Sequence, residues 1–229
     1  MSRATELHRS YILHTRKYRD TSLLVEVLSR EEGRYSLIVK GARSKKPRFH
    51  LQLFSPVLVS SIGRSELRTA REVEADGPGY HIAGRNLMIG MYVNELLYRL
   101  MGKFDPIPSL FDRYGQLLSL LQSEPFDTGY LRAFEISLLA DLGYGISFGV
   151  ESTTGDEIVD EGRYCYFVED GFHYAGENHA ARTIEGRHLR AIAEGRIDAD
   201  ADRVARGVVR QSVNQLLGGK PLHSRRLFT

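Results

Sequence analysis

The sequence predicts an α+β protein in which a small β-barrel precedes a helical domain. Five short segments of β-type composition, with Gly-containing turns and no helical period, occupy the first 76 residues. Helical periodicity follows residue 79, and two aromatic-rich runs joined by Asp-Gly interrupt it later in the chain. We therefore predict a barrel domain over residues 1–79 and a helical domain over residues 80–229, with a β-hairpin region at about 150–176.

The five predicted strands are rich in β-branched and apolar residues. Short connections containing Gly33 and Gly63 join the second strand to the third and the fourth to the fifth. Five strands of this kind in a small domain are typical of an oligonucleotide/oligosaccharide-binding (OB) barrel. The strands are expected at Tyr11–His14, Leu23–Leu28, Arg34–Lys40, Val57–Ile62 and Leu67–Val73.

Apolar residues at helical spacing predict five helices in the second domain. Asp76-Gly-Pro-Gly79 marks its beginning, because two glycines and a proline end a strand. Between the third and fourth helices, Tyr164–Val168 and Phe172–Tyr174 are expected to form the hairpin. The helices are expected at Asn86–Met101, Leu110–Leu121, Tyr130–Leu142, Gly186–Glu194 and Ala201–Leu217.

Charge is distributed unevenly although the net charge is only +2. Met1–His50 holds twelve basic residues against five acidic ones, whereas Glu151–Glu185 holds two basic residues against nine acidic ones. Clustered Lys and Arg favour a polyanionic partner for the first segment, because binding of phosphates releases counterions. A solvated basic surface is the alternative, and the role of the acidic segment is open.

Few residues suggest catalysis or metal binding. Cys165 is the single cysteine, so the chain can form neither an internal disulfide nor a four-thiolate zinc site. The histidines lack the spacing of a metal motif. We therefore predict no catalytic residue, no cofactor and no metal ligand. An N-terminal apolar segment and a run of about 18 apolar residues are also missing, so we expect a cytoplasmic protein without membrane partners.

A basic cluster after the third strand is the most informative local feature. Its side chains lie on a connection where they can follow a phosphate backbone, and basic residues of the preceding strands extend the surface. Tyr18, Tyr35 and Phe49 alternate with these cations and are either stacking platforms or core residues. The candidate nucleic-acid contacts are Lys40, Arg43, Lys45, Lys46 and Arg48, together with Arg16, Lys17, Arg19 and Arg34.

The predicted helix Tyr130–Leu142 has two apolar stripes. The first should face the core, while the second consists of Arg132, Ile136 and Leu139 about a quarter-turn away. An apolar shelf beside an arginine suits a peptide that carries a hydrophobic residue next to a carboxylate. The alternative is that this second stripe packs on a neighbouring helix.

Seven short motifs carry a resemblance to a known family. Their order and spacing together are specific, although each is short. They are Tyr18-Arg-Asp-Thr-Ser-Leu-Leu24, Lys40-Gly-Ala-Arg-Ser-Lys45, Leu51-Gln-Leu-Phe-Ser-Pro56, Tyr92-Val-Asn-Glu-Leu-Leu97, Arg132-Ala-Phe-Glu135, Leu142-Gly-Tyr-Gly145 and Gly218-Gly-Lys-Pro-Leu-His-Ser-Arg225. Over nearly its whole length the chain resembles the bacterial RecO family of recombination and repair proteins.

The resemblance implies a non-enzymatic, nucleoid-associated mediator that binds single- and double-stranded DNA and anneals complementary strands. Its implied partners are RecR, the C-terminal tail of the single-stranded DNA-binding protein SSB and, indirectly, RecA, which it helps to load on gapped DNA. The family's basic barrel surface maps onto Lys40, Arg43 and Lys45, and its SSB-tail pocket onto the helix that carries Arg132. Many members hold zinc with four cysteines, but this chain has only Cys165 in that region, so we expect a zinc-free hairpin.

Two other classes of function remain open. The carboxylates of the acidic segment are numerous enough for a magnesium-dependent nuclease, although no phosphate-binding motif surrounds them. A protein-only interaction adaptor is the second alternative, and it would not bind DNA at moderate salt. The carboxylates in question are Glu151, Asp156, Glu157, Asp160 and Glu161.

Overall fold

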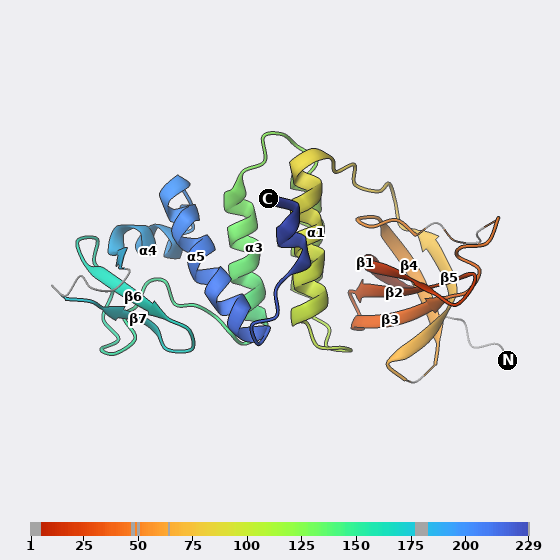
Figure 1. The fold of residues 1–229 in the computed structure, drawn as a ribbon, viewed down its shortest axis with the longest axis horizontal. Coiled ribbons are helices and arrows are strands. Elements are labelled where there is room, and N and C mark those ends of the chain that lie inside the picture. The colour runs from red at the N-terminus through yellow and green to blue at the C-terminus, as the bar shows by residue number, and fades with distance from the viewer. Residues whose placement is uncertain (1–5, 47–48, 50, 64, 177–182, 229) are drawn as a thin grey trace. The chain divides into compact units, whose positions relative to one another are not determined.

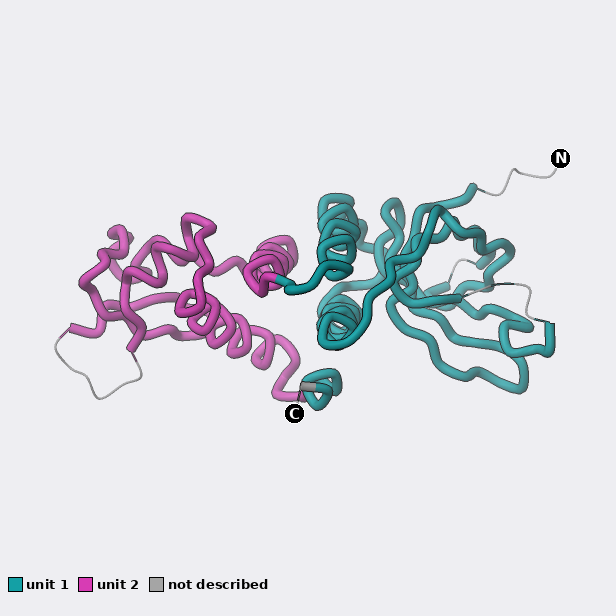
Figure 2. The backbone as a smooth tube through the Cα atoms, turned by 90° about the horizontal axis from the view of Figure 1, so that it is seen from above, with its two compact units in different colours: residues 1–126, 222–229 teal, residues 127–221 magenta. Residues whose placement is uncertain are grey.

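The computed structural model describes residues 6–46, 49, 51–63, 65–176 and 183–228 (Figure 1). The chain forms two compact units, which are coloured separately in Figure 2. Unit 1 contains residues 1–126 and 222–229, and unit 2 contains residues 127–221. The domain boundary expected after residue 79 stays a prediction.

Five strands of unit 1 close into a barrel in the order β1-β2-β3-β5-β4, and β4 pairs back with β1. All neighbouring strands are antiparallel except β3 and β5, which are parallel. This arrangement confirms the predicted OB barrel. The strands are β1 His8–Tyr18, β2 Ser22–Ser29, β3 Gly33–Val39, β4 Pro56–Ile62 and β5 Leu67–Ala75.

Apolar residues at alternating positions of the strands fill the barrel, because successive side chains of a strand point to opposite faces. On β3 these are Tyr35, Leu37 and Val39, each at most 1% exposed. The other buried members of this core are Ile12, Val25, Val27, Val57 and Val59.

The barrel continues into two helices of the same unit, α1 (Gly84–Leu100) and α2 (Pro108–Leu120). A bulge in β1 lies between Ile12 and His14, and the carbonyl of Leu13 at this bulge accepts a hydrogen bond from Asn94 of α1 at 3.0 Å. The Tyr114 hydroxyl of α2 donates to the Asn94 side chain at 2.5 Å. A buried polar chain therefore joins barrel, α1 and α2, and burial raises the pKa of Tyr114 well above its usual range.

The 3-10 helix η1 (His223–Phe228) also packs on α1. Its first backbone N–H groups, those of His223 and Ser224, donate to the Glu95 carboxylate at 2.8 and 2.7 Å. Burial opposes ionisation of Glu95, but hydrogen bonding by Ser224 and His223 outweighs it and lowers the pKa of the carboxyl. The last segment of the chain is thereby held on unit 1.

Unit 2 combines three helices with a small sheet of order β7-β6-β8. Its core gathers Phe148, Phe172, Leu189 and Val208 with other apolar residues of the sheet and the helices. Asp127 and Asp198 cap α3 and α5 by accepting hydrogen bonds from backbone N–H groups of the first turn. The elements are α3 Thr128–Asp141, β6 Arg163–Phe167, β7 Gly171–Tyr174, β8 Ile184–Glu185, α4 Gly186–Ala193 and α5 Ala199–Leu216.

The sequence correctly predicted the five barrel strands, the hairpin and the five α-helices, with shifts at their ends. It missed β8 and η1, which are short and are held by tertiary partners.

Within the described ranges, no group of three or more His, Cys, Asp or Glu residues is placed to hold a metal ion. No described helix is both long and apolar enough to cross a membrane.

Candidate nucleic-acid interface

The turn between β1 and β2 and the loop after β3 meet at one end of the barrel. The backbone N–H of Arg43 donates to the carbonyl of Thr21 at 2.8 Å. The Arg43 guanidinium also contacts the carbonyls of Arg19 and Asp20, each at 3.3 Å. Gly41 begins this loop with a φ of 70°, a conformation that glycine adopts without strain. Two basic stretches that are distant in the sequence therefore lie together.

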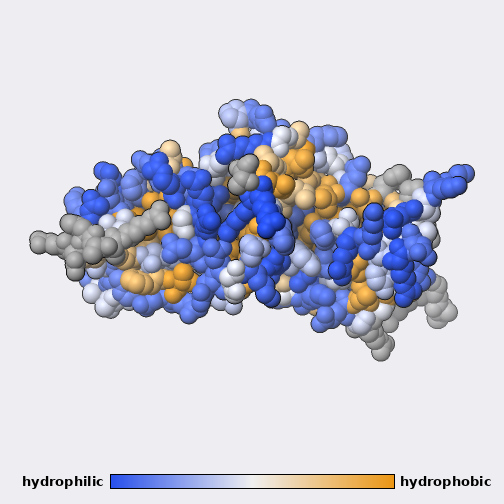
Figure 3. Space-filling model, viewed as in Figure 1, coloured by the Kyte–Doolittle hydropathy of each residue, from blue (hydrophilic) through white to orange (hydrophobic). Residues whose placement is uncertain are grey.

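We call the cations of these two stretches the basic surface. All seven are exposed, and within the described ranges none of them forms an ion pair with a carboxylate. Hydrophilic residues also cover most of the barrel on the face that Figure 3 shows. Unpaired cations on a strand end and a loop can neutralise phosphates without a fixed register. The basic surface consists of Arg16, Lys17, Arg19, Lys40, Arg43, Lys45 and Lys46.

Arg34, a further predicted contact, is buried at 9% exposure between the barrel and α1. Its guanidinium donates to the carbonyl of Met101 from Nε at 3.1 Å and from Nη2 at 2.9 Å. Nη1 pairs with Glu26 at 2.9 Å, and the Ser36 hydroxyl donates to the same carboxylate at 2.5 Å. Arg34 therefore joins β3 to the end of α1. Arg48, the last predicted contact, lies outside the described residues.

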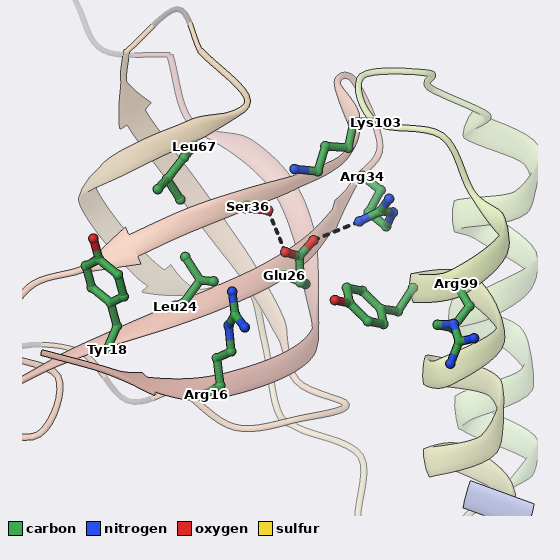
Figure 4. A pocket seen from close by; sticks show the side chains of 10 residues that line it. Arg16, Tyr18, Leu24, Glu26, Arg34, Ser36, Leu67, Arg99 and Lys103 are labelled. Carbon is green, nitrogen blue, oxygen red and sulfur yellow. Dashed lines mark hydrogen bonds and ion pairs between the residues drawn. The ribbon is translucent and has the colours of Figure 1, made fainter. Parts of the chain in front are cut away.

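A hollow of about 440 Å³ opens beside this buried network (Figure 4). Barrel strands supply most of its wall, and α1 with the segment that follows it supplies the rest. In Figure 4, Arg16 and Tyr18 of β1 lie on one side of Glu26, and Arg34 and Lys103 on the other. The lining residues are Arg16, Tyr18, Leu24, Glu26, Arg34, Ser36, Leu67, Tyr98, Arg99 and Lys103.

The three candidate stacking aromatics have different positions. Tyr35 is fully buried, and Phe49 is partly buried and packs against the barrel core. Tyr18 is half-buried on β1, and the Arg19 guanidinium carbon lies 5.4 Å from its ring centroid. The core interpretation therefore applies to Tyr35 and Phe49, and Tyr18 is the ring that reaches the hollow.

The second stripe of α3 is packed inside unit 2. Leu139 is 1% exposed, and Ile136 packs against the core of this unit. Arg132 is 7% exposed, and its guanidinium pairs with Glu135 at 2.6 Å and with Asp202 of α5 at 3.4 Å. The packing alternative thus describes these side chains, and their role toward the SSB tail stays a prediction. A peptide carboxylate there would compete with two existing ion pairs.

Among the described residues of the acidic segment, Glu151 is the buried carboxylate, at 5% exposure. Hydrogen bonds from the backbone N–H and the hydroxyl of Thr154, at 2.7 and 2.8 Å, hold its carboxylate within a turn. These bonds, the backbone bond first, lower the pKa of Glu151 to about 2. The group organises local backbone, which is a structural use of a carboxylate.

Tyr98, Arg99 and Lys103 were not predicted as functional residues. They follow an apolar helical pattern in the sequence, and only the packing of α1 on the barrel places them beside β1–β3. The adjacent Tyr98-Arg99 pair at the end of the helix is the one signal that the sequence offers.

Comparisons with known proteins cover nearly the whole chain. Residues 1–77 match the family "Recombination protein O N terminal", and residues 83–226 match "Recombination protein O C terminal". A DNA repair protein RecO of Methylococcus capsulatus is 40% identical over 226 residues, which are 97% of this chain and 92% of that protein. The DNA repair protein RecO of Pseudoalteromonas atlantica is 37% identical over 227 residues, 98% of this chain and 95% of that protein.

Proposed function

Because the chain belongs to the RecO family of DNA repair and recombination proteins, we propose that it is a non-enzymatic, DNA-binding recombination mediator. It binds single- and double-stranded DNA and anneals complementary strands. It acts with RecR and SSB to load RecA on gapped DNA. The observation that carries DNA binding is the basic surface, in which two cation-rich segments meet at one end of the barrel without carboxylate partners in the described chain.

The basic surface supports binding that is largely independent of sequence. Its cations lie on a strand end, a turn and a loop, and none of these elements is a helix that could enter a major groove. Backbone contacts of this kind fix position and affinity, whereas contacts with base edges specify sequence. Family membership supports annealing and the partnership with RecR, SSB and RecA.

The first experiment replaces Lys45 and Lys46 with alanine. DNA binding is measured by fluorescence anisotropy at several salt concentrations, for single strands of unrelated sequence. We expect weaker binding to every sequence and a log–log salt slope that is flatter by about 0.7–0.9 for each lost contact. The matched control replaces Arg206 and Arg210, two exposed cations of α5. If both double variants weaken DNA binding equally, or if the Lys45 and Lys46 variant has an unchanged salt slope, the assignment of DNA binding to the barrel is contradicted.

The second experiment separates a mediator from a nuclease. Labelled complementary strands are incubated with the protein and magnesium, and the products are resolved on native and denaturing gels. Annealing of intact strands is expected, and cleavage would overturn the non-enzymatic assignment. A pull-down on SSB-coated single strands, with and without RecR, then tests the partners; no retention in either case would remove SSB and RecR from the proposal.

A further inference from the structure

We propose that the hollow between the barrel and α1 is a pocket for one unstacked nucleotide of single-stranded DNA. This inference rests on the proposed function, because it assigns a subsite to a strand that the basic surface already holds. Arg16 belongs to both regions, since it is exposed on β1 and also lines the hollow. A DNA strand that follows the basic surface along β1 therefore also reaches the pocket.

The lining combines positive charge with aromatic rings. Of its ten lining residues, four are cations, one is a carboxylate and two are tyrosines; a serine and two leucines make up the rest. A nucleotide presents the matching chemistry, an anionic phosphate attached to a flat ring that stacks on aromatic side chains. Only two of the ten lining side chains, Leu24 and Leu67, are aliphatic, whereas a groove for a peptide helix needs a row of apolar anchor positions. The nucleotide is accordingly the better fit.

Internal pairing leaves the rim positive. Glu26 is satisfied by Arg34 and Ser36, so its charge is neutralised within the network at the base of the hollow. Among the remaining cations, Lys103 pairs at 3.2 Å with Glu66, whose side chain is 76% exposed. Ion pairs with such exposed partners are weak, and a phosphate can replace the carboxylate.

The other two rim cations differ in their partners. Arg99 pairs at 3.7 Å with Glu95, a carboxylate that also accepts the two backbone N–H groups of η1. Arg16 has no carboxylate partner within the described ranges. Arg16 and Lys103 are therefore the cations most available for a phosphate.

Tyr18 supplies the stacking surface. It lies two residues after Arg16 on β1, so both side chains point to the same face of the strand. The volume of about 440 Å³ lies within the range of small-ligand sites. A base of an intact duplex would have to leave its stack to enter, whereas a base of a single strand is free to do so. The pocket is therefore expected to recognise single strands.

The test compares two ligands that share their phosphates and differ in their bases. Anisotropy measures binding of a 15-residue oligothymidylate and of a 15-residue strand with abasic sites throughout. Because stacking on one aromatic contributes a base-dependent part of affinity, we expect wild-type protein to prefer the oligothymidylate by about tenfold. Tyr18→Ala should remove most of this preference while leaving the abasic strand and a 15-base-pair duplex bound as before. Tyr18→Phe should restore it.

Two variants serve as controls. Tyr144→Ala removes an exposed tyrosine of unit 2 and should leave the preference intact. The Lys45 and Lys46 double variant should weaken binding of both single strands by the same factor, because it removes phosphate contacts alone. Circular dichroism and thermal unfolding establish that each variant is folded.

The outcomes distinguish the pocket from the proposed function. If folded Tyr18→Ala weakens both strands equally, or neither, the pocket assignment fails although DNA binding stands. If wild-type protein binds neither strand, the proposed function fails as well. Free thymidine monophosphate and a peptide of aspartates ending in phenylalanine are tested as competitors. If either of them displaces the oligothymidylate from wild-type protein, and Tyr18→Ala abolishes this displacement, the assignment of the pocket to a DNA strand is overturned.

Discussion

The basic surface of unit 1 and the charged residues of unit 2 use ionic groups in opposite ways. On the barrel, seven exposed cations have no carboxylate partner within the described chain. In unit 2, Asp160 pairs with Arg190 at 3.1 Å, and Glu185 pairs with Arg163 and Arg187. These two carboxylates of the acidic segment are thus engaged by cations of their own unit. The net charges of the two segments are equal in size and opposite in sign, so charge alone does not distinguish their roles. The absence of carboxylate partners among the described residues leaves the cations of the barrel free to attract a polyanion.

Arg132 gives the strongest test of the structural use of charge in unit 2. We expect Arg132→Ala to lower the free energy of unfolding by about 3–5 kcal/mol, because it removes the cation that pairs with the Glu135 carboxylate, whose side chain is 1% exposed, and with Asp202. Urea unfolding followed by circular dichroism measures the change.

The double variant Arg132→Met, Glu135→Met is the control, because it removes both buried charges together. It should recover part of the lost stability, since Asp202 still loses its cation in this variant. A single variant as stable as wild type would show that this pair does not matter to unit 2. Any loss of SSB-tail binding in an Arg132 variant has to be judged against this change in stability.

Glu151 connects unit 2 to pH. Its pKa of about 2 in the folded chain lies below the usual value of 4.5, so its contribution to stability is present above pH 4.5 and is lost as the pH falls toward 2. We expect Glu151→Gln to be less stable than wild type near neutral pH, with a difference that narrows across this window. Thermal unfolding between pH 2 and pH 7 measures it. A constant difference would mean that ionisation of Glu151 does not stabilise the turn.

The exposed pair of Asp160 and Arg190 should matter less. Both side chains are about half exposed, at 51% and 45%, so we expect Asp160→Asn to cost at most about 1 kcal/mol. The effect should shrink at high salt, because solvent ions screen exposed charges. Denaturation at low and high salt checks both expectations, and a large salt-independent loss would contradict them.

Lys40 should have the smallest effect on stability and a clear effect on binding. Lys40→Ala removes an exposed cation without a carboxylate partner in the described chain, so the free energy of unfolding should change by no more than about 0.5 kcal/mol. The salt slope of DNA binding should nevertheless fall by about 0.7–0.9. A Lys40→Ala variant that is destabilised but binds DNA as before would show that this cation of the barrel serves stability and not DNA binding.

The fold was accessible from the sequence because its local signals agree with its tertiary structure. Alternating apolar residues such as Tyr35, Leu37 and Val39 do fill the barrel, and Asp-Gly does join β6 to β7. The position of Arg34 was not accessible, since its burial depends on the approach of the Met101 carbonyl at the end of α1. Charge identifies a candidate contact, but only packing decides whether a cation is exposed.

The sequence predicted only the part of the candidate site that lies in one continuous segment. Lys40, Arg43 and Lys45 are adjacent in a basic motif, so the sequence displays them together. Tyr98 and Lys103 lie in a separate segment that has an apolar helical pattern, and nothing local indicates that they share a wall with β1. Sites assembled from distant segments require the tertiary structure.

The bonds between Glu95 and η1 have a consequence for dissecting the molecule. Since residues 222–229 belong to unit 1, unit 2 is an insertion within unit 1 rather than an appendage that follows it. Truncation after residue 126 would leave the Glu95 carboxylate without the N–H donors of His223 and Ser224. Excision of residues 127–221, with a flexible linker in their place, retains every segment of unit 1. A barrel fragment for DNA-binding studies is therefore better obtained by internal deletion than by shortening the chain.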